Sequence, residues 1–402
     1  MFILNAANAA IITACLRVAC ELDVAETLRE VGSEGLHVER IAPGKVNSDL
    51  LARILGLLAM HHIFREVTPN VFTNLNRISA ALDKGKTQEE LGCAETRPAD
   101  ASGPAAVVEL LQVKILIAEE NMKMVAFLGE AALTTQENQR NLPFNHVFRT
   151  DETFYAWIEC PENAWRRQRF GFVMDATAAW EPPHTILTGF DWSTLPAGSL
   201  VVDVGGGNGN TSMQIARTNP SLRIVVQDLD SAIKGAKLHW QSNFPSHIDN
   251  KMVSFQAHNF FTPQPITDAS IFLLRYILHN WADEKAVLIL QHLRAAAQPT
   301  TRLIVVDMIL AYACPPSAAE SGPETYAVEG TTRPSAPSPL LANWGPASSF
   351  AYTLDLCTYS YHGGEERTLG AFLDVFARAG WKLVRVYNPP ASQLSHLECI
   401  PI

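Results

Sequence analysis

A glycine-rich segment near the middle of the chain constrains the fold more than any other feature. Residues 203–209 read DVGGGNG and follow the apolar run 200–202. The pattern predicts a buried parallel strand, a glycine turn and a helix over about 211–217. Glycines let the backbone approach a ligand closely, and the start of the following helix offers unpaired N–H groups to an anion. We therefore expect a nucleotide-type cofactor at this turn, with a purely structural tight turn as the alternative.

The order of the glycines separates the possible cofactors. A dinucleotide-binding turn needs glycine at its first, third and sixth positions, and the sixth position counted from Gly205 is Asn210. The order D-x-G-x-G-x-G instead resembles motif I of the class I S-adenosylmethionine (SAM) methyltransferases. Residues 222–228 then form a β-branched segment that ends at Asp228, where a doubly wound sheet places a carboxylate for ribose hydroxyls. Asp230 is the alternative position for this acid.

Composition bounds the class of protein. The chain has 402 residues, of which 47% are hydrophobic, so it can bury ample core and form two domains. Its formal net charge of −10 argues against a nucleic-acid partner, which would normally require a basic face. The cysteines are scattered and contain no C-x-x-C pair, so neither a disulfide framework nor a zinc site is indicated, and we expect no metal. They are Cys15, Cys20, Cys93, Cys160, Cys314, Cys357 and Cys399.

The apolar start of the chain resembles a packing helix more than a signal peptide. It lacks a basic leading region, and Asn5, Asn8 and Arg17 interrupt it. No apolar stretch is long enough to span a bilayer. We expect a cytoplasmic enzyme.

The first 82 residues favour helices followed by a small hairpin. Apolar residues recur at helical spacing over 9–28, and a second apolar helix begins with Ser48 as its polar cap. Residues 62–73 form two strands around a Pro-Asn turn. This is the order of a winged helix, which could bind DNA. The helix at 50–60, which would contact DNA, carries a single basic residue, Arg53. A protein-interaction module is therefore favoured over a DNA reader.

The rest of the chain divides into a linker, a helical region and an alternating region. Residues 83–104 are polar with Gly and Pro, helices are expected from there to about 133, and 145–180 are rich in large apolar side chains. Alternating strands and helices after 200 predict a mostly parallel doubly wound sheet, and 313–342 a long surface loop. We place strands near 200–204, 223–227, 270–274, 302–308, 382–388 and 395–400. Large apolar side chains such as those of 145–180 more often form core than pocket. The predicted domains are 1–102, winged helix and linker, and 103–402, whose first helices, about 103–180, would line a substrate pocket if the family resemblance described below holds.

His279 is the candidate general base. A phenol has a pKa near 10 and is mostly protonated at neutral pH, so an oxygen acceptor gains from a base. His279 follows the strand predicted at 270–274, near the sheet edge where ligands bind, and histidine titrates near neutrality. A lone histidine beside a tryptophan, here Trp281, is more often structural, so the residues alone leave both roles open.

Several further motifs resemble one family. Residues 274–284, LRYILHNWADE, are similar to the catalytic segment of the plant and fungal small-molecule O-methyltransferases, the caffeate-type family with an N-terminal winged-helix dimerisation domain. The ending EERT at 365–368, then Phe372 and the AGW at 379–381, resembles that family's E-R-T motif and terminal A-G-F/W. Together with motif I and Asp228, the resemblance covers nearly the whole chain. It implies a Rossmann-like class I methyltransferase domain that uses SAM and releases S-adenosylhomocysteine.

The resemblance also implies roles for individual residues. His279 would be the base, oriented by two acids, Asp307, where the plant enzymes have the longer Glu, and Glu366. The structural alternatives are that Asp307 caps a strand end and that Glu366 pairs with Arg367. The cofactor residues would be Asp203, Gly205, Gly207, Gly209, Asp228, Asn259, Phe260 and Arg275. The pocket residues would be Phe154, Phe172, Met174, Asn280, Cys357, Ser360 and Tyr361.

The chain departs from the family pattern at two positions. Asn280 and Asn259 stand where the family has Asp. An amide keeps an acceptor oxygen but loses the charge, so we expect binding to survive and substrate preference to shift. The chain also starts closer to the winged helix than family members do, without part of the helical region that intertwines in their dimers. A homodimer is still expected.

The resemblance predicts methylation of a phenolic or enolic hydroxyl on a small fungal secondary metabolite, such as an aromatic or polyketide. The alternative is a fungal relative that uses bound SAM as a fixed positive charge to steer a dehydration or pericyclic reaction. The presence of His279, Asp307 and Glu366 favours transfer, because the alternative has less need of a phenol base. A DNA-binding regulator with a vestigial catalytic domain is disfavoured by the charge.

Overall fold

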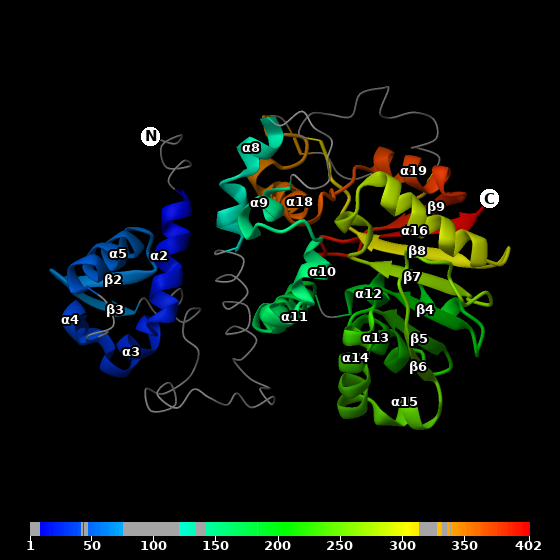
Figure 1. The fold of residues 1–402 in the computed structure, drawn as a ribbon, viewed down its shortest axis with the longest axis horizontal. Coiled ribbons are helices and arrows are strands. Elements are labelled where there is room, and N and C mark those ends of the chain that lie inside the picture. Colours follow the sequence, from blue (N-terminus) through cyan, green and yellow to red (C-terminus); the bar gives the residue numbers. More distant parts are fainter. Residues whose placement is uncertain are drawn as a thin grey trace. The chain divides into compact units, whose positions relative to one another are not determined.

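The chain forms two compact units, residues 1–180 and 181–402 (Figure 1). The computed structural model describes residues 9–41, 43, 47–74, 120–133, 142–182, 184–312, 328–331, 336, 337 and 339–402. The predicted linker at 83–104 and most of the loop predicted at 313–342 lie outside the described residues. The domain boundary at 102/103 therefore stays a prediction.

The first unit begins with helices and a small antiparallel sheet of order β1-β3-β2. The predicted hairpin is confirmed as β2 and β3, whereas β1 was not predicted. The prediction of one continuous helix over 9–28 is wrong, because α2 ends at Glu21 and α3 starts at Val24. The break occurs where Asp23 has left-handed backbone geometry (φ 53°). The elements are α2 (Ala9–Glu21), α3 (Val24–Val31), η1 (Gly32–Glu34), β1 (Leu36–His37), α4 (Val38–Ile41), α5 (Ser48–Met60), β2 (Phe64–Thr68) and β3 (Val71–Asn74).

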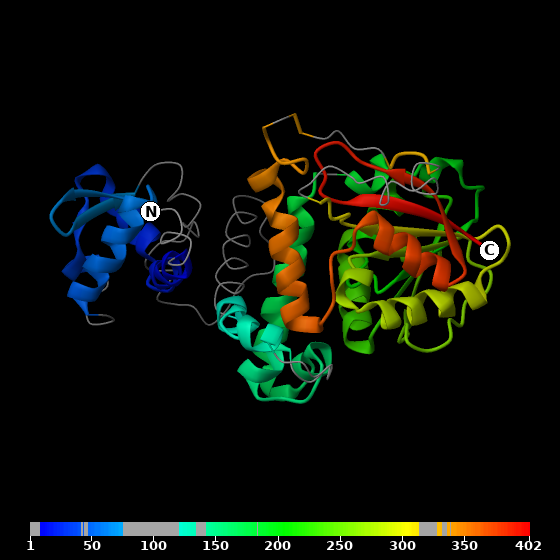
Figure 2. The same ribbon diagram turned by 90° about the horizontal axis from the view of Figure 1, so that it is seen from above.

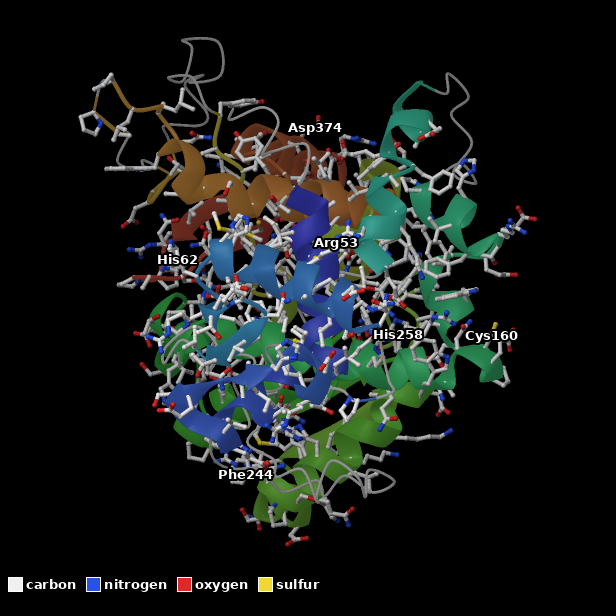
Figure 3. All side chains as sticks on the ribbon, turned by 90° about the vertical axis from the view of Figure 1, so that its left-hand side faces the viewer. Arg53, His62, Cys160, Phe244, His258 and Asp374 are labelled. Carbon is white, nitrogen blue, oxygen red and sulfur yellow. The ribbon has the colours of Figure 1, made fainter. Side chains whose placement is uncertain are left out.

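Helix α5 is held by its cap and by one apolar face. The Asn47 side chain accepts a hydrogen bond from the Leu50 amide at 2.9 Å, so the cap lies one residue before the predicted Ser48. Leu51, Leu55 and Leu58 are fully buried against the strands. Arg53 is exposed on the same helix (Figure 3). This face is built for packing within the unit, as the sequence indicated.

The described helices between 128 and 180 contain a cluster of aromatic rings. They are α8 (Leu128–Leu133), α9 (Pro143–Phe148), α10 (Phe154–Ile158), η3 (Pro161–Asn163) and α11 (Ala164–Trp180). Phe144 is fully buried and meets Phe154 and Trp157 edge to face, with ring centroids 5.7 and 5.2 Å apart. Such pairs stabilise a core beyond the area they bury. Phe154, a predicted pocket residue, is thus also a core residue of this cluster.

The second unit is built on a seven-stranded sheet of order β6-β5-β4-β7-β8-β10-β9. The five strands from β6 to β8 are parallel, and β10 runs antiparallel to both β8 and β9. The elements are α12 (Thr185–Thr188), η4 (Trp192–Thr194), β4 (Leu200–Val204), α13 (Asn210–Thr218), β5 (Arg223–Asp228), α14 (Asp230–Asn243), α15 (Pro245–Asp249), β6 (Val253–Ala257), β7 (Ile271–Arg275), η5 (Leu278–Asn280), α16 (Asp283–Ala296), β8 (Arg302–Asp307), η6 (Gly345–Ser348), α18 (Ser349–His362), α19 (Leu369–Arg378), β9 (Trp381–Tyr387) and β10 (Ser395–Pro401).

The predicted doubly wound sheet is confirmed, and all six predicted strands are present. The strand β6 was missed because only Val253 of its five residues is buried, so the segment lacks a continuous apolar run. Helices α16 and α19 lie side by side along the sheet (Figures 1 and 2), while α13 and α14 pack against β5. The strand order reverses between β4 and β7, and ligands of such sheets bind beyond the carboxyl ends of the strands at this point.

Two further observations concern the whole of the described chain. None of its helices combines the length and apolar character needed to cross a membrane. The described cysteines Cys15, Cys20, Cys160, Cys357 and Cys399 form no disulfide bond.

Candidate active site

The glycine turn lies between β4 and α13 and is held by the neighbouring strand β5. Both Gly205 and Gly206 donate their amides to the Gln227 carbonyl, at 2.8 and 3.0 Å. Gly207 has a φ of 58°, which L side chains rarely adopt, and a Cβ added there would meet nothing within 4 Å. The space over Gly207 is therefore open to a ligand. This is the cradle that a nucleotide-type cofactor requires.

Asp203 lies beneath this turn rather than on its surface. The side chain is 2% exposed, and a Cβ on Gly206 would overlap its carboxyl group at 2.6 Å. Burial raises the pKa of Asp203 to about 6, which a hydrogen bond with Ser212 opposes. In the described structure Asp203 supports the turn, and a direct contact with the cofactor stays a prediction.

Asp228 is fixed at the end of β5 by two backbone amides. Its Oδ2 accepts from the Gly207 amide at 2.8 Å, and its Oδ1 accepts from the Leu229 amide at 2.7 Å. The glycine turn and the acid predicted to bind ribose are thus joined directly. The alternative acid, Asp230, forms an exposed ion pair with Lys234 at 2.6 Å. Asp228 is therefore the better placed of the two.

The base loop, residues 276–281, follows β7 next to the glycine turn. Tyr276 has a φ of 55°, a strained conformation for a large side chain, and its ring centroid is 5.3 Å from that of His279. Its amide donates to the Val306 carbonyl of β8 at 3.1 Å. Backbone strain of this kind is found where a site fixes a side chain. Tyr276 was not singled out in the sequence, because backbone strain leaves no pattern there.

His279 forms a buried pair with Glu366. The imidazole Nδ1 lies 2.6 Å from Glu366 Oε1, and the two side chains are 10% and 1% exposed. An ionised carboxylate can only accept, so in the neutral imidazole Nδ1–H donates and Nε2 carries the lone pair. Burial lowers the pKa of His279, but the Glu366 charge and hydrogen bond, aided by Asp307, more than offset it. The net pKa of His279 is raised above its ordinary value.

Asp307, the other predicted acid, is held differently. It is fully buried at the end of β8, and neither of its oxygens has a hydrogen-bond partner among the described residues. Burial raises the pKa of Asp307 to about 7, and the nearby His279 opposes this shift. Asp307 therefore influences the base through its charge, whereas Glu366 contacts it. The described ion pairs of Arg367 are with Asp283 and Glu365, not with Glu366.

A second histidine, His362, lies close to His279 and was not predicted from the sequence. Burial, and then the charge of His279, lowers the pKa of His362 to about 3. This histidine stays neutral at working pH. His362 is the last residue of α18 and belongs to no motif in the sequence. Its proximity to His279 arises only in the folded structure.

The remaining predicted cofactor residues surround the two loops. Asn259 Oδ1 accepts a hydrogen bond from the backbone amide of Phe261 at 3.0 Å. The Asn259 side chain therefore stabilises the turn in which it lies. Phe260 lies 3.6 Å from where a Gly205 Cβ would be, beside Trp281 (ring centroids 6.0 Å apart). The Arg275 guanidinium lies 5.0 Å from the Tyr276 ring centroid. Their contacts with a cofactor stay predictions.

The predicted pocket residues come from both units. Asn280 donates its side-chain amide to the Tyr276 carbonyl at 3.3 Å. On α18, the Ser360 hydroxyl donates to the Leu356 carbonyl at 2.7 Å, and Cys357 and Tyr361 are partly buried. Phe154 lies on α10, and Phe172 and the exposed Met174 on α11 of the first unit. A pocket made of these residues stays a prediction.

Comparisons with known proteins agree with this geometry. Residues 129–328 match the O-methyltransferase domain family. An O-methyltransferase of Armillaria gallica is 39% identical over 402 aligned positions, covering 97% of this chain and 82% of that protein. The 4-O-methyltransferase 1 of Phanerochaete chrysosporium is 36% identical over 391 positions, covering 96% and 81%. The mitomycin 7-O-methyltransferase structure has a TM-score of 0.72 at 19% identity, covering 100% of this chain and 97% of that one.

The sheet order, the glycine turn and the base loop define a class I methyltransferase fold. The chain belongs to the O-methyltransferase family, and it is a SAM-dependent O-methyltransferase. The residues present fit the cofactor: the open space over Gly207 leaves room for it, and Asp228 is oriented by backbone amides beside that space. The family resemblance seen in the sequence is thereby confirmed.

Proposed function

We propose that this enzyme methylates a phenolic or enolic hydroxyl of a small secondary metabolite, with His279 as the general base. The observation that carries the proposal is the 2.6 Å contact between His279 Nδ1 and Glu366 Oε1 inside the protein. In the neutral imidazole, this contact holds the proton on Nδ1, so the lone pair is on Nε2 and available to an acceptor hydroxyl. An elevated pKa makes this nitrogen a stronger proton acceptor than a free imidazole.

The proton route uses only this chain's residues. SAM supplies an electrophilic methyl group on a sulfonium when bound. The acceptor hydroxyl gives its proton to Nε2 of His279 as its oxygen gains the methyl group, and the Glu366 carboxylate stabilises the imidazolium. The product ether keeps no proton at that oxygen, so the proton leaves from His279 to solvent. Asp307, buried nearby, adds to this stabilisation when ionised.

Cofactor and pocket roles complete the proposal. Gly207 would let the cofactor approach the backbone, and Asp228 would accept from ribose hydroxyls. Gly205 and Gly209 would keep the turn packed, because added Cβ atoms there would overlap Ile277 and Trp240. Asn259, Phe260 and Arg275 would surround the rest of the cofactor. Asn280 would contact the acceptor as a neutral acceptor and donor. The curated relatives named above support O-methylation as the reaction, and one of them is named for the 4-position of its own substrate.

The proposed assembly is a homodimer formed through the first unit. Leu50, Met60 and Val67 are 47%, 78% and 40% exposed there, which is apolar surface that a partner subunit would cover. Light scattering at micromolar concentration should give twice the mass of one chain. A monomer with full activity would contradict the dimer.

The acceptor class is tested by incubating the enzyme with methyl-labelled SAM and a panel of phenols and enols. We expect a product heavier by one labelled methyl group, formed only from acceptors with a free hydroxyl. A substrate that is isomerised or dehydrated without gaining a methyl would instead support the pericyclic alternative. The fold alone leaves that alternative open, because a structure described as a pericyclic reaction enzyme has a TM-score of 0.65 at 19% identity.

A further inference from the structure

The buried guanidinium of Arg367 connects the E-R-T segment to the base loop. Its side chain has no exposed surface. Nη1 donates to the Leu278 carbonyl at 2.8 Å, and Nη2 donates to the Trp281 carbonyl at 2.7 Å. Nε and Nη2 also donate to Asp283 Oδ1, at 3.0 and 2.8 Å. One side chain thus holds the backbone on both sides of His279.

The backbone of the same segment holds the remaining carbonyl of the loop. The Glu365 amide donates to the His279 carbonyl at 2.9 Å. Gly364 packs against this carbonyl so closely that an added Cβ would overlap it, and would lie 2.5 Å from the Asn280 carbonyl carbon. Residues 364–367 therefore fix the path of the base loop. Glu366 lies within this segment and delivers its carboxylate to His279.

We propose that Arg367, paired with Asp283, is a positioning residue for the methyl transfer, which keeps the base loop in register so that His279 Nδ1 meets Glu366. The inference rests on the proposed function of His279 as the base. It extends that function to a side chain that does not touch the imidazole, and that sequence reasoning considered only as a partner of Glu366.

The chemistry of the contact requires arginine. A planar guanidinium presents its donors in a fixed fork, so it can satisfy two carbonyls and a carboxylate at once. A lysine ammonium keeps the charge but is a compact point with no such fork. Asp283 is the compensating charge, at the first residue of α16 and 38% exposed. Removing it leaves the buried guanidinium with only the longer pair to Glu365, at 3.5 Å, while the two carbonyl contacts can persist.

Three variants test the proposal, and each one changes a different interaction with the base loop. Arg367→Lys removes the fork, Asp283→Asn removes the compensating charge, and Gly364→Ala displaces the loop without changing any charge. Two variants on α19 serve as matched controls. Arg378→Gln breaks an exposed pair with Glu284, and the Cβ of Gly370→Ala meets only Thr368 Oγ1 at 3.9 Å. Thermal unfolding of each variant separates loss of folding from loss of register.

We expect kcat to fall about 10- to 100-fold in Arg367→Lys and Gly364→Ala, as for loss of a charge-assisted hydrogen bond, and less in Asp283→Asn. SAM affinity by calorimetry should stay within about twofold, because the glycine turn is held by β5 instead. The acid limb of kcat against pH should move to lower pH. Without the Glu366 contact, burial dominates and lowers the pKa of His279. The other titratable groups near His279, namely Asp307, Tyr276, Glu366 and His362, are unchanged in these variants.

The controls should keep the wild-type kcat and acid limb. The proposal is overturned if Arg367→Lys and Gly364→Ala remain folded with wild-type kcat and an unmoved acid limb, or if they lose only thermal stability. His279→Ala measured alongside separates the two claims. If His279→Ala is itself fully active, the proposed function fails; if it is inactive while the Arg367 and Gly364 variants are normal, only the positioning role fails.

Discussion

The glycine turn and the base loop lie at the ends of neighbouring strands, β4 and β7, yet they are held in different ways. The turn is fixed by hydrogen bonds to Gln227 and Asp228 at the end of the next strand along the chain, β5. The base loop is fixed by residues 364–367, more than eighty positions away. Cofactor binding should therefore be locally robust, while catalysis depends on long-range contacts.

The two loops also differ electrostatically. Around the turn, Asp228 accepts hydrogen bonds from two backbone amides, at 2.8 and 2.7 Å. Around the base, Asp307, Glu366 and His279 are buried and His362 is partly buried. Burial is the first influence on the pKa of Asp307, His279 and His362. Changes at the turn should act on affinity, and changes at the base loop on rate and its pH dependence.

The largest expected effect is on rate. His279→Ala should lower kcat by roughly 10²- to 10⁴-fold, the scale of a lost general base, while calorimetry finds SAM affinity nearly unchanged. Activity should recover in part at high pH, where a phenol with a pKa near 10 ionises unaided. Wild-type turnover of the true acceptor by His279→Ala near pH 7 would show that the histidine is structural.

A substitution in the glycine turn, Gly207→Val, should act on the affinity for SAM. In Gly207→Val the side chain would fill the open space over the turn and would need a φ of 58°, so SAM binding should fall below detection in calorimetry. The acid limb of any residual activity should not move. Unchanged SAM affinity in this variant would remove the cofactor from the glycine turn and break the comparison.

A smaller effect concerns stability. The folded pKa of Asp307 is raised to about 7, so its contribution to folding is intact below pH 4 and is lost as pH rises through about 7. Asp307→Asn should leave the free energy of unfolding unchanged at pH 4 and raise it at pH 8, by on the order of 4 kcal/mol. Denaturant unfolding at both pH values measures this difference.

Asp374→Asn is the matched control, because Asp374 is an exposed residue on α19 (Figure 3). It should show no gain at pH 8. Equal stabilisation by Asp307→Asn at both pH values would mean that the Asp307 carboxyl is not held in its protonated form.

What could be predicted from the sequence follows the same division. The strand, the glycine turn and Asp228 form one contiguous pattern, and all six predicted strands are present in the second unit. The break between α2 and α3 could not be predicted from the sequence, because it depends on the backbone conformation of one residue, Asp23, within an apolar repeat. Strand β6 was missed because only Val253 of its five residues is buried, so it has no continuous apolar run.

The candidate site was predictable in its members but not in its contacts. His279 and Glu366 were named from motifs, yet only the fold brings Nδ1 to 2.6 Å from the carboxylate and leaves Asp307 without a hydrogen-bond partner among the described residues. The roles of Arg367 and Tyr276 depend on three-dimensional packing, for which residue spacing carries no signal. The pairing of Glu366 with Arg367, considered as an alternative, is replaced by the pairing with His279.

The central claim is that Glu366 orients His279 and raises its pKa. The pH dependence of kcat in the wild type and in Glu366→Gln tests this claim most directly. In the wild type, the rate should rise with pH with a midpoint above about 6.5, because the pKa of His279 is raised. In Glu366→Gln, burial should dominate, so the midpoint should move to lower pH while the plateau falls about 10- to 100-fold. An unmoved midpoint together with an unchanged plateau would contradict the account.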